Sequence, residues 1–335
     1  MSHGGKEANT NNTYLITKQT KLMKNYFRFN LEGKTLLPAW IGMILLVVVP
    51  YIAMIYLTGQ ATANYEKPTA MWLIVPILFV SFPVCNFYII RIMIESLEYN
   101  GESLRSDITL GRFYGIYISG MLLSIITLGI YSPWFITKMQ SYISEKTSYK
   151  SREFIFMGEA GNLFGILTLT LILPMIALIV FVIFAFPEHK AVTTTETIIQ
   201  QVLTWVIMIP YIYYLYKWTF NFKHNGYHIK WNTENIPAMG KVAKEILLSI
   251  ITLGIYYPMA WIRLYEYFIH KTESNVVDNQ QIRFGYDIEA KDDYLYLWKQ
   301  ILLSIVTLGI YYPWAISNVG KRILDKTYME KIVVG

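Results

Sequence analysis

Four long, almost uncharged apolar stretches constrain this chain more than any other feature of its sequence. They cover residues 37–57, 71–94, 163–186 and 198–218, and charged side chains occur only in the last few residues of two of them. Each stretch is long enough to cross about 30 Å of hydrocarbon as a helix. Charged residues make up 16% of the chain, whereas a soluble domain usually carries about 25%. The sequence therefore predicts an α-helical protein that crosses a membrane several times.

The residues outside these stretches argue against several other classes of protein. Residues 1–36 are polar, and the apolar stretch that follows is too long for a signal-peptide core, so we expect no cleaved signal and a disordered polar segment over residues 1–25. The single cysteine, Cys85, has no partner for a disulfide within the chain. The net charge is +6, but the basic residues are scattered rather than clustered, which argues against nucleic-acid binding.

One twelve-residue segment occurs three times, as LLSIITLGIYSP at residues 122–133, LLSIITLGIYYP at 247–258 and LLSIVTLGIYYP at 302–313. The lysine of a Lys-Thr pair lies 17 residues after the central glycine of each copy. We call this segment the motif. A match of this length in three copies predicts a protein built from repeated units.

A longer repeat encloses the first two copies, because Pro50 and Pro174 are 124 residues apart and Pro83 and Pro210 are 127 apart. Short alternating segments predict strands at 27–29, 97–99, 154–156, 220–222 and 282–284, and the pairs at 100–101 and 225–226 are the Asn-Gly signal of a tight hairpin. We therefore predict a first membrane repeat over residues 26–152, a second over 153–280 and a shortened third over 281–335.

These repeats resemble the YjgN-like family of bacterial inner-membrane proteins. The resemblance rests on the Phe-x-Phe segments and on the pattern Leu-Leu-Ser-Ile-x-Thr-Leu-Gly-Ile-Tyr-x-Pro-Trp, and it covers residues from about 26 to 335. Trp134 and Trp314 follow the proline directly, while the middle copy has Met259 there and Trp261 three residues after its proline. The resemblance implies a multi-pass protein of the bacterial inner (cytoplasmic) membrane. The family has no assigned activity, so the resemblance implies no catalytic residues and no cofactor.

The distribution of charge bears on whether the motif crosses the membrane. If all three copies cross, giving seven transmembrane helices, Lys and Arg divide into 15 inside and 14 outside. If none crosses, only Lys67 and Lys190 of the 29 lie outside, which is the asymmetry expected of cytoplasmic loops. We therefore predict four transmembrane helices, three broken motif hairpins, short cytoplasmic β-hairpins and both termini in the cytoplasm, with seven transmembrane helices as the alternative.

The residues of the motif are those of a helix end followed by a helix start. A glycine can take the left-handed conformation that ends a helix, and a proline four residues later suits the first turn of the next helix. These structural residues are Gly129, Pro133, Gly254, Pro258, Gly309 and Pro313. After the second copy, Trp261, Leu264, Tyr265 and Phe268 lie on one helical face. An amphipathic helix of this kind lies at the membrane interface.

The sequence contains no pattern typical of an enzyme or a metal site. His224 and His228 flank an Asn-Gly turn, no Gly-x-Ser-x-Gly, His-Glu-x-x-His or phosphate-binding loop is present, and no pair of carboxylates falls within an apolar stretch. We expect no catalytic activity, no metal and no cofactor.

Polar residues that recur in the motif invite a functional interpretation as the lining of a pore or a ligand site. They are Thr127, Tyr131, Thr252, Tyr256, Thr307 and Tyr311. The structural alternative is that the threonines bond their own helix carbonyls and the tyrosines anchor the interface. Two functions remain open. One is a passive conduit or transporter for a small neutral or amphiphilic molecule. The other is a lipid-interacting scaffold, or a membrane protein that binds a partner. Membrane lipids are the expected partners, and a homo-oligomer stays open.

Overall fold

The computed structural model describes residues 24–64, 69–185 and 194–334. Four of its helices are long and apolar enough to cross a membrane, and they cover Gly33–Ala63, Met71–Glu95, Ala160–Phe184 and Glu196–Thr219. The prediction of four apolar helices of spanning length is confirmed. Lys67, Lys190 and residues 1–23 of the predicted disordered segment lie outside the described residues. Asn25, the last residue of that segment, belongs to a strand, so the segment predicted to be disordered ends too late.

The first and third long helices each contain a π-helical turn just before a proline. The first comprises α1 (Gly33–Met43), η1 (Ile44–Val48) and α2 (Val49–Ala63), and the third comprises α6 (Ala160–Leu167), η2 (Thr168–Ile172) and α7 (Leu173–Ala185). Pro50 and Pro174 follow these turns, and a proline cannot donate the α-helical hydrogen bond. In the π-helical turn before each proline, the backbone hydrogen bonds span five residues instead of four. The other two long helices are α3 (Ala70–Glu95) and α8 (Thr194–Thr219).

Each copy of the motif forms two helices joined by a tight turn rather than one continuous helix. The first short hairpin is α4 (Leu110–Ile126) with α5 (Ser132–Glu145), the second is α9 (Asn235–Ile251) with α10 (Tyr257–His270), and the third is α11 (Ala290–Val306) with α12 (Tyr312–Leu324). Gly129, Gly254 and Gly309 have φ of +90°, +86° and +84°.

The left-handed conformation begins one residue earlier than the sequence suggests. Leu128, Leu253 and Leu308 precede these glycines and all have φ of 50°. In the first copy the N–H of Leu128 donates to the carbonyl of Ile125 at 3.1 Å, and that of Gly129 to the carbonyl of Ser124 at 2.6 Å. This is the Schellman pattern of a helix end. A leucine therefore shares the strained turn with the glycine.

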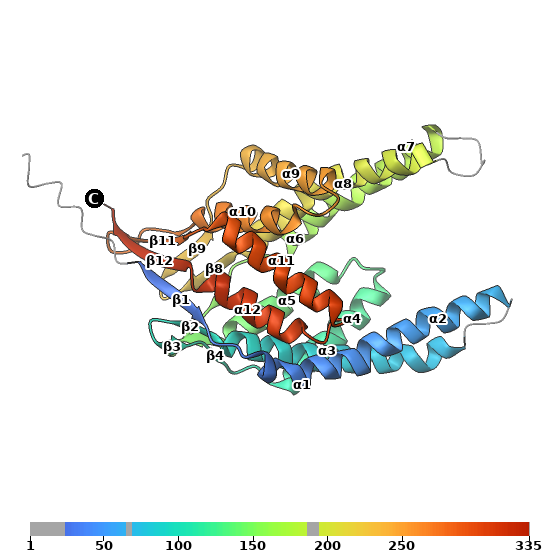
Figure 1. The fold of residues 1–335 in the computed structure, drawn as a ribbon, viewed down its shortest axis with the longest axis horizontal. Coiled ribbons are helices and arrows are strands. Elements are labelled where there is room, and N and C mark those ends of the chain that lie inside the picture. Colours follow the sequence, from blue (N-terminus) through green and yellow to red (C-terminus); the bar gives the residue numbers. More distant parts are fainter. Residues whose placement is uncertain (1–23, 65–68, 186–193, 335) are drawn as a thin grey trace, which may run out of the picture.

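The strands lie at the end of the molecule from which all the helices project (Figure 1). They are β1 (Asn25–Phe29), β2 (Leu97–Tyr99), β3 (Glu102–Ser103), β4 (Arg105–Ser106), β5 (Thr147–Tyr149), β6 (Arg152–Glu153), β7 (Ile155–Phe156), β8 (Asn221–His224), β9 (Tyr227–Trp231), β10 (Thr272–Ser274), β11 (Gln280–Tyr286) and β12 (Thr327–Val333). The five predicted strand segments all overlap strands, although Phe220 lies just before β8 and Phe154 lies between β6 and β7.

The antiparallel pairings form a closed cycle rather than separate hairpins. Nine strands follow the order β3-β2-β1-β12-β11-β10-β9-β8-β7, and β4-β5-β6 form a second sheet. Only Leu104 separates β3 from β4, and only Phe154 separates β6 from β7. The N–H of Leu104 donates to the carbonyl of Leu97 in β2, and the N–H of Phe154 donates to the carbonyl of Thr147 in β5. The two sheets are thus continuous through these bent strands. We call the result the strand ring.

Aromatic side chains occupy the concave face of the strand ring. The ring of Phe27 lies 5.0 Å from that of Tyr99, and Tyr99 lies 5.7 Å from Tyr149. His224 lies 6.2 Å from Tyr149 and stacks on Phe154 at 4.3 Å. Several of these contacts join strands that have another strand between them, which would be about 9–10 Å apart in a flat sheet. Strong curvature therefore brings these side chains together, and we call them the aromatic cluster.

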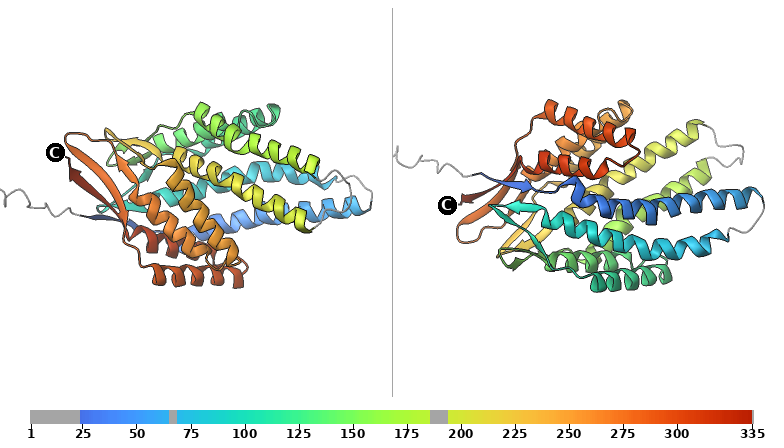
Figure 2. Two further views of the ribbon diagram at one scale, coloured as in Figure 1. Left: turned by 90° about the horizontal axis from the view of Figure 1, so that it is seen from above. Right: turned by 60° about the horizontal axis from the view of Figure 1, so that its bottom comes forward.

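All five helical hairpins, two long and three short, leave the strand ring in the same way. The ascending helices α1, α4, α6, α9 and α11 each begin four residues after the preceding strand ends. At each base, the N–H after the ascending strand donates to a carbonyl at the start of the returning strand. The pairs are Asn30 with Ser96, Asp107 with Lys146, Met157 with Asn221, Asn232 with Lys271 and Asp287 with Lys326, at 2.8–3.0 Å. The hairpins therefore begin at a common level, and the short ones end partway along the long ones (Figure 2).

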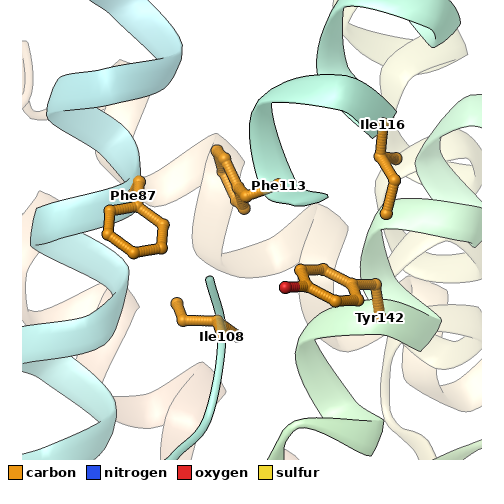
Figure 3. Close-up of a cluster of buried hydrophobic side chains, with 5 residues drawn as sticks. All are labelled: Phe87, Ile108, Phe113, Ile116 and Tyr142. Carbon is orange, nitrogen blue, oxygen red and sulfur yellow. The ribbon is translucent and has the colours of Figure 1, made fainter. Parts of the chain in front are cut away.

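Neighbouring hairpins pack side by side, with α3 against α4, α5 against α6, α8 against α9, α10 against α11 and α12 against α1. Figure 3 shows one such contact, in which Phe87 of α3 lies beside Phe113 of α4, and Ile116 of α4 and Tyr142 of α5 belong to the same buried cluster. The hydroxyl of Tyr142 also accepts a hydrogen bond from the N–H of Thr109 at 2.9 Å. The repeat boundaries proposed at 152/153 and 280/281 fall at the beginnings of β6 and β11.

Candidate functional site

A cavity of about 730 Å³ lies among α10, α11 and α12, with one side chain from α3. Its lining consists of Met93, Tyr257, Pro258, Trp261, Tyr265, Leu297, Gln300, Ile301, Ser304, Ile305, Tyr312, Ala315, Ile316, Val319, Gly320, Ile323 and Leu324. Near the turns, Tyr257 is 59% exposed and Ile305 62%, whereas Leu297 is 6% exposed and Ile323 3%. The cavity therefore opens toward the hairpin turns and closes toward the strand ring.

The chemistry of the lining suits a molecule with an apolar body. No lining residue is charged, and the polar side-chain groups come from Gln300, Ser304, Trp261 and three tyrosines. Small-molecule pockets typically measure about 300–1,000 Å³ and combine mostly apolar walls with a few polar groups. The Ser304 hydroxyl donates to the Gln300 carbonyl at 2.9 Å, so it serves its own helix. The cavity can hold an uncharged or amphiphilic molecule.

A polar side chain supports the motif tyrosine in two of the three short hairpins. The residue nine positions before the central glycine is Gly120, Glu245 or Gln300. In the third hairpin the hydroxyl of Tyr311 donates to Gln300 Oε1 at 3.0 Å, and in the second that of Tyr256 donates to Glu245 Oε2 at 2.8 Å. In the first, the ring of Phe135 lies where a Cβ on Gly120 would be. Alignment of the three copies could have revealed Glu245 and Gln300, because both are polar residues at the same position directly before the apolar run of the motif.

The buried Glu245 carboxylate is held by its own hairpin. Its side chain is fully buried, and Lys241 Nζ lies 2.9 Å from Oε1. That oxygen nevertheless has no hydrogen bond of acceptable geometry. The ion pair is the better description of the contact, because charge attraction depends on distance more than on angle. Lys241 is itself partly exposed, so the pair extends from the protein interior to the surface.

The motif threonines complete the turns of their own hairpins. The hydroxyls of Thr127, Thr252 and Thr307 each donate to the carbonyl four residues earlier at 2.8 Å. Each also accepts the N–H of the motif tyrosine, Tyr131, Tyr256 or Tyr311, at 3.0 Å. The cavity is lined instead by Tyr257 and Tyr312, the residues after two of these tyrosines. The interpretation of the threonines and tyrosines as a pore lining stays a prediction.

The structural residues of the motif lie at the turns. Apart from the two adjacent residues, no described residue has an atom within 4 Å of the position that a Cβ would take on Gly129, Gly254 or Gly309. Pro133, Pro258 and Pro313 are fully buried in the first turn of the descending helices. Carbonyls at two turns bond to neighbouring hairpins, since Trp40 Nε1 donates to Gly309 at 2.9 Å and Trp298 Nε1 donates to Ile255 at 3.0 Å.

A buried acid joins the third hairpin to the strand ring below the cavity. The fully buried Asp293 accepts hydrogen bonds from Arg322 Nε at 2.7 Å, Lys326 Nζ at 2.6 Å and the hydroxyl of Tyr286 at 2.8 Å. Burial raises the pKa of Asp293, but these hydrogen bonds outweigh burial and leave the pKa below its usual value. Burial and the hydrogen bond to Asp293 raise the pKa of Tyr286. The cluster is internally paired, which favours a structural role.

The histidines flanking the Asn-Gly turn are not arranged as metal ligands. His224 Nδ1 lies 3.3 Å from the carbonyl of Glu153, and His228 Nε2 lies 2.6 Å from Asn221 Oδ1. Among the described residues, no group of three or more His, Cys, Asp or Glu side chains could hold a metal ion. His224 also contacts Tyr149 and Phe154, so it belongs to the aromatic cluster rather than to a solvated turn.

Comparisons with known proteins confirm the resemblance to the YjgN-like family. The model of a family described as bacterial protein of unknown function (DUF898) matches residues 9–283. The inner membrane protein YjgN of Salmonella typhimurium is 26% identical over 154 residues, which cover 43% of this chain and 37% of that protein. The match thus spans little more than a third of the relative's length. No solved structure matches this chain.

Proposed function

This chain belongs to the DUF898, YjgN-like family of bacterial proteins of unknown function, and from that premise we propose that it is a passive conduit or transporter for a small neutral or amphiphilic molecule. The observation that carries the proposal is the uncharged cavity among α10, α11 and α12. Burial of apolar surface drives binding to such a cavity, while Gln300 and the tyrosines orient a polar end. No catalytic activity is part of the proposal.

The cavity favours access from the lipid side. It opens toward the hairpin turns, and the aromatic cluster occupies the concave face of the strand ring at the other end. A water-soluble solute would have to pass this cluster, whereas an amphiphile already dissolved in the membrane would not. A lipid-like amphiphile is therefore the substrate class that the geometry supports best.

The proposed orientation places the strand ring and both termini in the cytoplasm of a bacterium, with four crossings of the inner membrane. It is supported by the distribution of Lys and Arg in the sequence and by the name of the Salmonella relative. Cytoplasmic loops are the usual location of these cations.

Reconstitution with a fluorescent-headgroup phospholipid tests the conduit. A membrane-impermeant reductant destroys only the label in the outer leaflet, so transport appears as additional loss of fluorescence. We expect transport above that of protein-free vesicles, and we expect Ile301→Trp, which fills the cavity, to lower the rate severalfold. The matched control is Ile246→Trp, at the same position of the second hairpin and outside the cavity lining. Equal rates for the wild type and empty vesicles would refute transport of this probe.

A lipid-interacting scaffold is the second candidate, favoured by the large apolar side chains exposed on the short hairpins. This function predicts no transport, and it predicts association with a partner or with further copies of the chain. Mass measurement in several detergents tests self-association. A monomer that also transports the labelled lipid would exclude a purely structural role based on self-association.

A further inference from the structure

The turns of the three short hairpins expose large apolar side chains almost completely. Leu128 and Leu253 are each 93% exposed and Leu308 is 91% exposed. Their neighbours Ile126, Ile130, Ile251, Ile255, Val306 and Ile310 are 61–79% exposed. We call these three groups the apolar tips. Apolar patches of this kind usually mark a contact with lipid or with another molecule.

The backbone conformation makes the choice of leucine unusual. A φ of 50° is strained for leucine, while glycine or asparagine adopts it more easily. Leucine nevertheless occupies this position in all three copies. The backbone conformation does not favour leucine over asparagine. The property that leucine has and asparagine lacks at this position is an exposed apolar side chain.

The N–H groups of the turns are hydrogen-bonded, which lowers the cost of placing them in lipid. Within each turn the N–H groups of Leu and Gly bond to the preceding helix, and the threonine hydroxyl accepts the tyrosine N–H. Trp40 and Trp298 further donate to the carbonyls of Gly309 and Ile255. The turns can therefore enter hydrocarbon without an unpaired N–H group.

The depth of the tips follows from the common base of the hairpins. The long helices and the short hairpins start at one level and project from one side of the strand ring. Each tip leucine is at least eight residues from the nearest charged residue, which is about 12 Å along a helix. One leaflet contributes about 15 Å of hydrocarbon. The uncharged tips are thus long enough to extend through most of one leaflet and too short to cross the bilayer.

We propose that the three apolar tips insert as re-entrant wedges into the hydrocarbon of the leaflet nearest the strand ring. Lipid acyl chains are the occupant of this surface, because the tips lie beside the exposed apolar surfaces of the four long helices and continue them. Charged residues near the bases of the wedges, such as Lys244, Arg263 and Lys299, lie at the level of the headgroups. The proposal does not depend on transport through the cavity.

Fluorescence quenching in vesicles of a brominated phospholipid tests the depth of the tips. In a Cys85→Ala background, Leu128→Cys, Leu253→Cys and Leu308→Cys each carry one environment-sensitive label. The control is Ser151→Cys, which also has a positive φ but lies in a turn between strands. We expect bromines midway along the acyl chain to quench the three tips and not Ser151→Cys, and aqueous iodide to quench only Ser151→Cys. Quenching of the tips by iodide and not by bromolipid would overturn the proposal.

A second measurement uses label-free variants in the same vesicles. Asparagine suits the left-handed turn but is costly in hydrocarbon, so we expect Leu128→Asn, Leu253→Asn and Leu308→Asn each to lower the melting temperature. Ser151→Asn should leave it unchanged or raise it. If the leucine variants melt higher than the wild type, the tips lie in water. Should a cysteine variant at a leucine fail to fold, Ile130→Cys, Ile255→Cys or Ile310→Cys reports on the same tip.

Discussion

The three central glycines show how one residue position decides between two folds of the same segment. Replacing a glycine within a continuous helix by alanine would stabilise the protein by about 1 kcal/mol. A glycine at positive φ loses stability instead, because the new Cβ approaches the following carbonyl. The observed φ values of +84° to +90° place all three in the second class.

The first prediction therefore concerns alanine substitutions at these positions. We expect Gly129→Ala, Gly254→Ala and Gly309→Ala each to lower the free energy of unfolding by about 1 kcal/mol or more. Empty space around each glycine removes steric crowding as an alternative cause. The control is Gly115→Ala within α4, which also has open space and should stabilise by up to about 1 kcal/mol. Thermal melts in detergent show whether each variant lowers or raises the melting temperature. A higher melting temperature for all three turn variants would favour the seven-helix alternative.

The second prediction concerns Asp293, whose carboxylate is fully buried between two cations. Asp293→Asn leaves Arg322 and Lys326 without their main partner, so we expect a loss on the order of 3 kcal/mol in the free energy of unfolding at neutral pH. Glu289→Gln is the control, because this exposed carboxylate pairs with the same cations and should matter little. Equal effects of the two variants would contradict the importance of burial.

The third prediction concerns acid sensitivity at His224. Burial in the aromatic cluster lowers the pKa of His224 below its ordinary 6.5, outweighing the raising effect of the Glu153 carbonyl. The unfolded chain then binds the proton more readily, so stability is complete above the ordinary pKa and falls as the pH drops below it. We expect His224→Phe to reduce the loss of melting temperature between about pH 7.5 and 5.5. Burial also lowers the pKa of His228, so part of the loss of melting temperature in acid should remain in the His224→Phe variant.

At the scale of helices, strands and turns, the sequence predicts a turn where it contains a strong turn signal and misses turns that lack one. The Asn-Gly pairs at 100–101 and 225–226 form turns in which both residues have positive φ, as expected of type I′ turns. Lys150-Ser151 and Asp278-Asn279 adopt the same conformation without a glycine. Lys-Ser carries no turn signal, and Asp-Asn is a weaker signal than Asn-Gly. The π turns before Pro50 and Pro174 were also beyond the sequence pattern, because a proline is compatible with a kink as well as with a wider turn.

The cavity is even harder to predict from the sequence than these turns. The cavity combines Met93 with residues of α10, α11 and α12 that follow it by more than 160 positions. Only the arrangement of hairpins around the strand ring brings them together, and no spacing within the sequence encodes it. Gln300 was within reach of prediction, because it occupies the same position before the motif as Glu245, whereas the apolar lining resembles any other packed helix.

At the scale of the whole molecule, the strand ring predicts the outcome of cysteine labelling in intact cells. In a Cys85→Ala background, we expect Ser151→Cys and Lys230→Cys to react with an impermeant maleimide only after permeabilisation, because the strand ring is proposed to lie in the cytoplasm. Lys190→Cys, in a predicted outer loop, is the control that should react without permeabilisation. Labelling of Ser151→Cys or Lys230→Cys from outside would contradict the proposed orientation.

The pairing of β1 with β12 also determines when folding can finish. Tyr26 and Tyr328 face each other across this pair, although 302 residues separate them in the chain. During synthesis β1 and β11 therefore wait with unpaired edges until β12 leaves the ribosome, and exposed edges of this kind invite aggregation. The strand ring therefore cannot close before β12 has been synthesised, and a chain interrupted before β12 would leave both edges open.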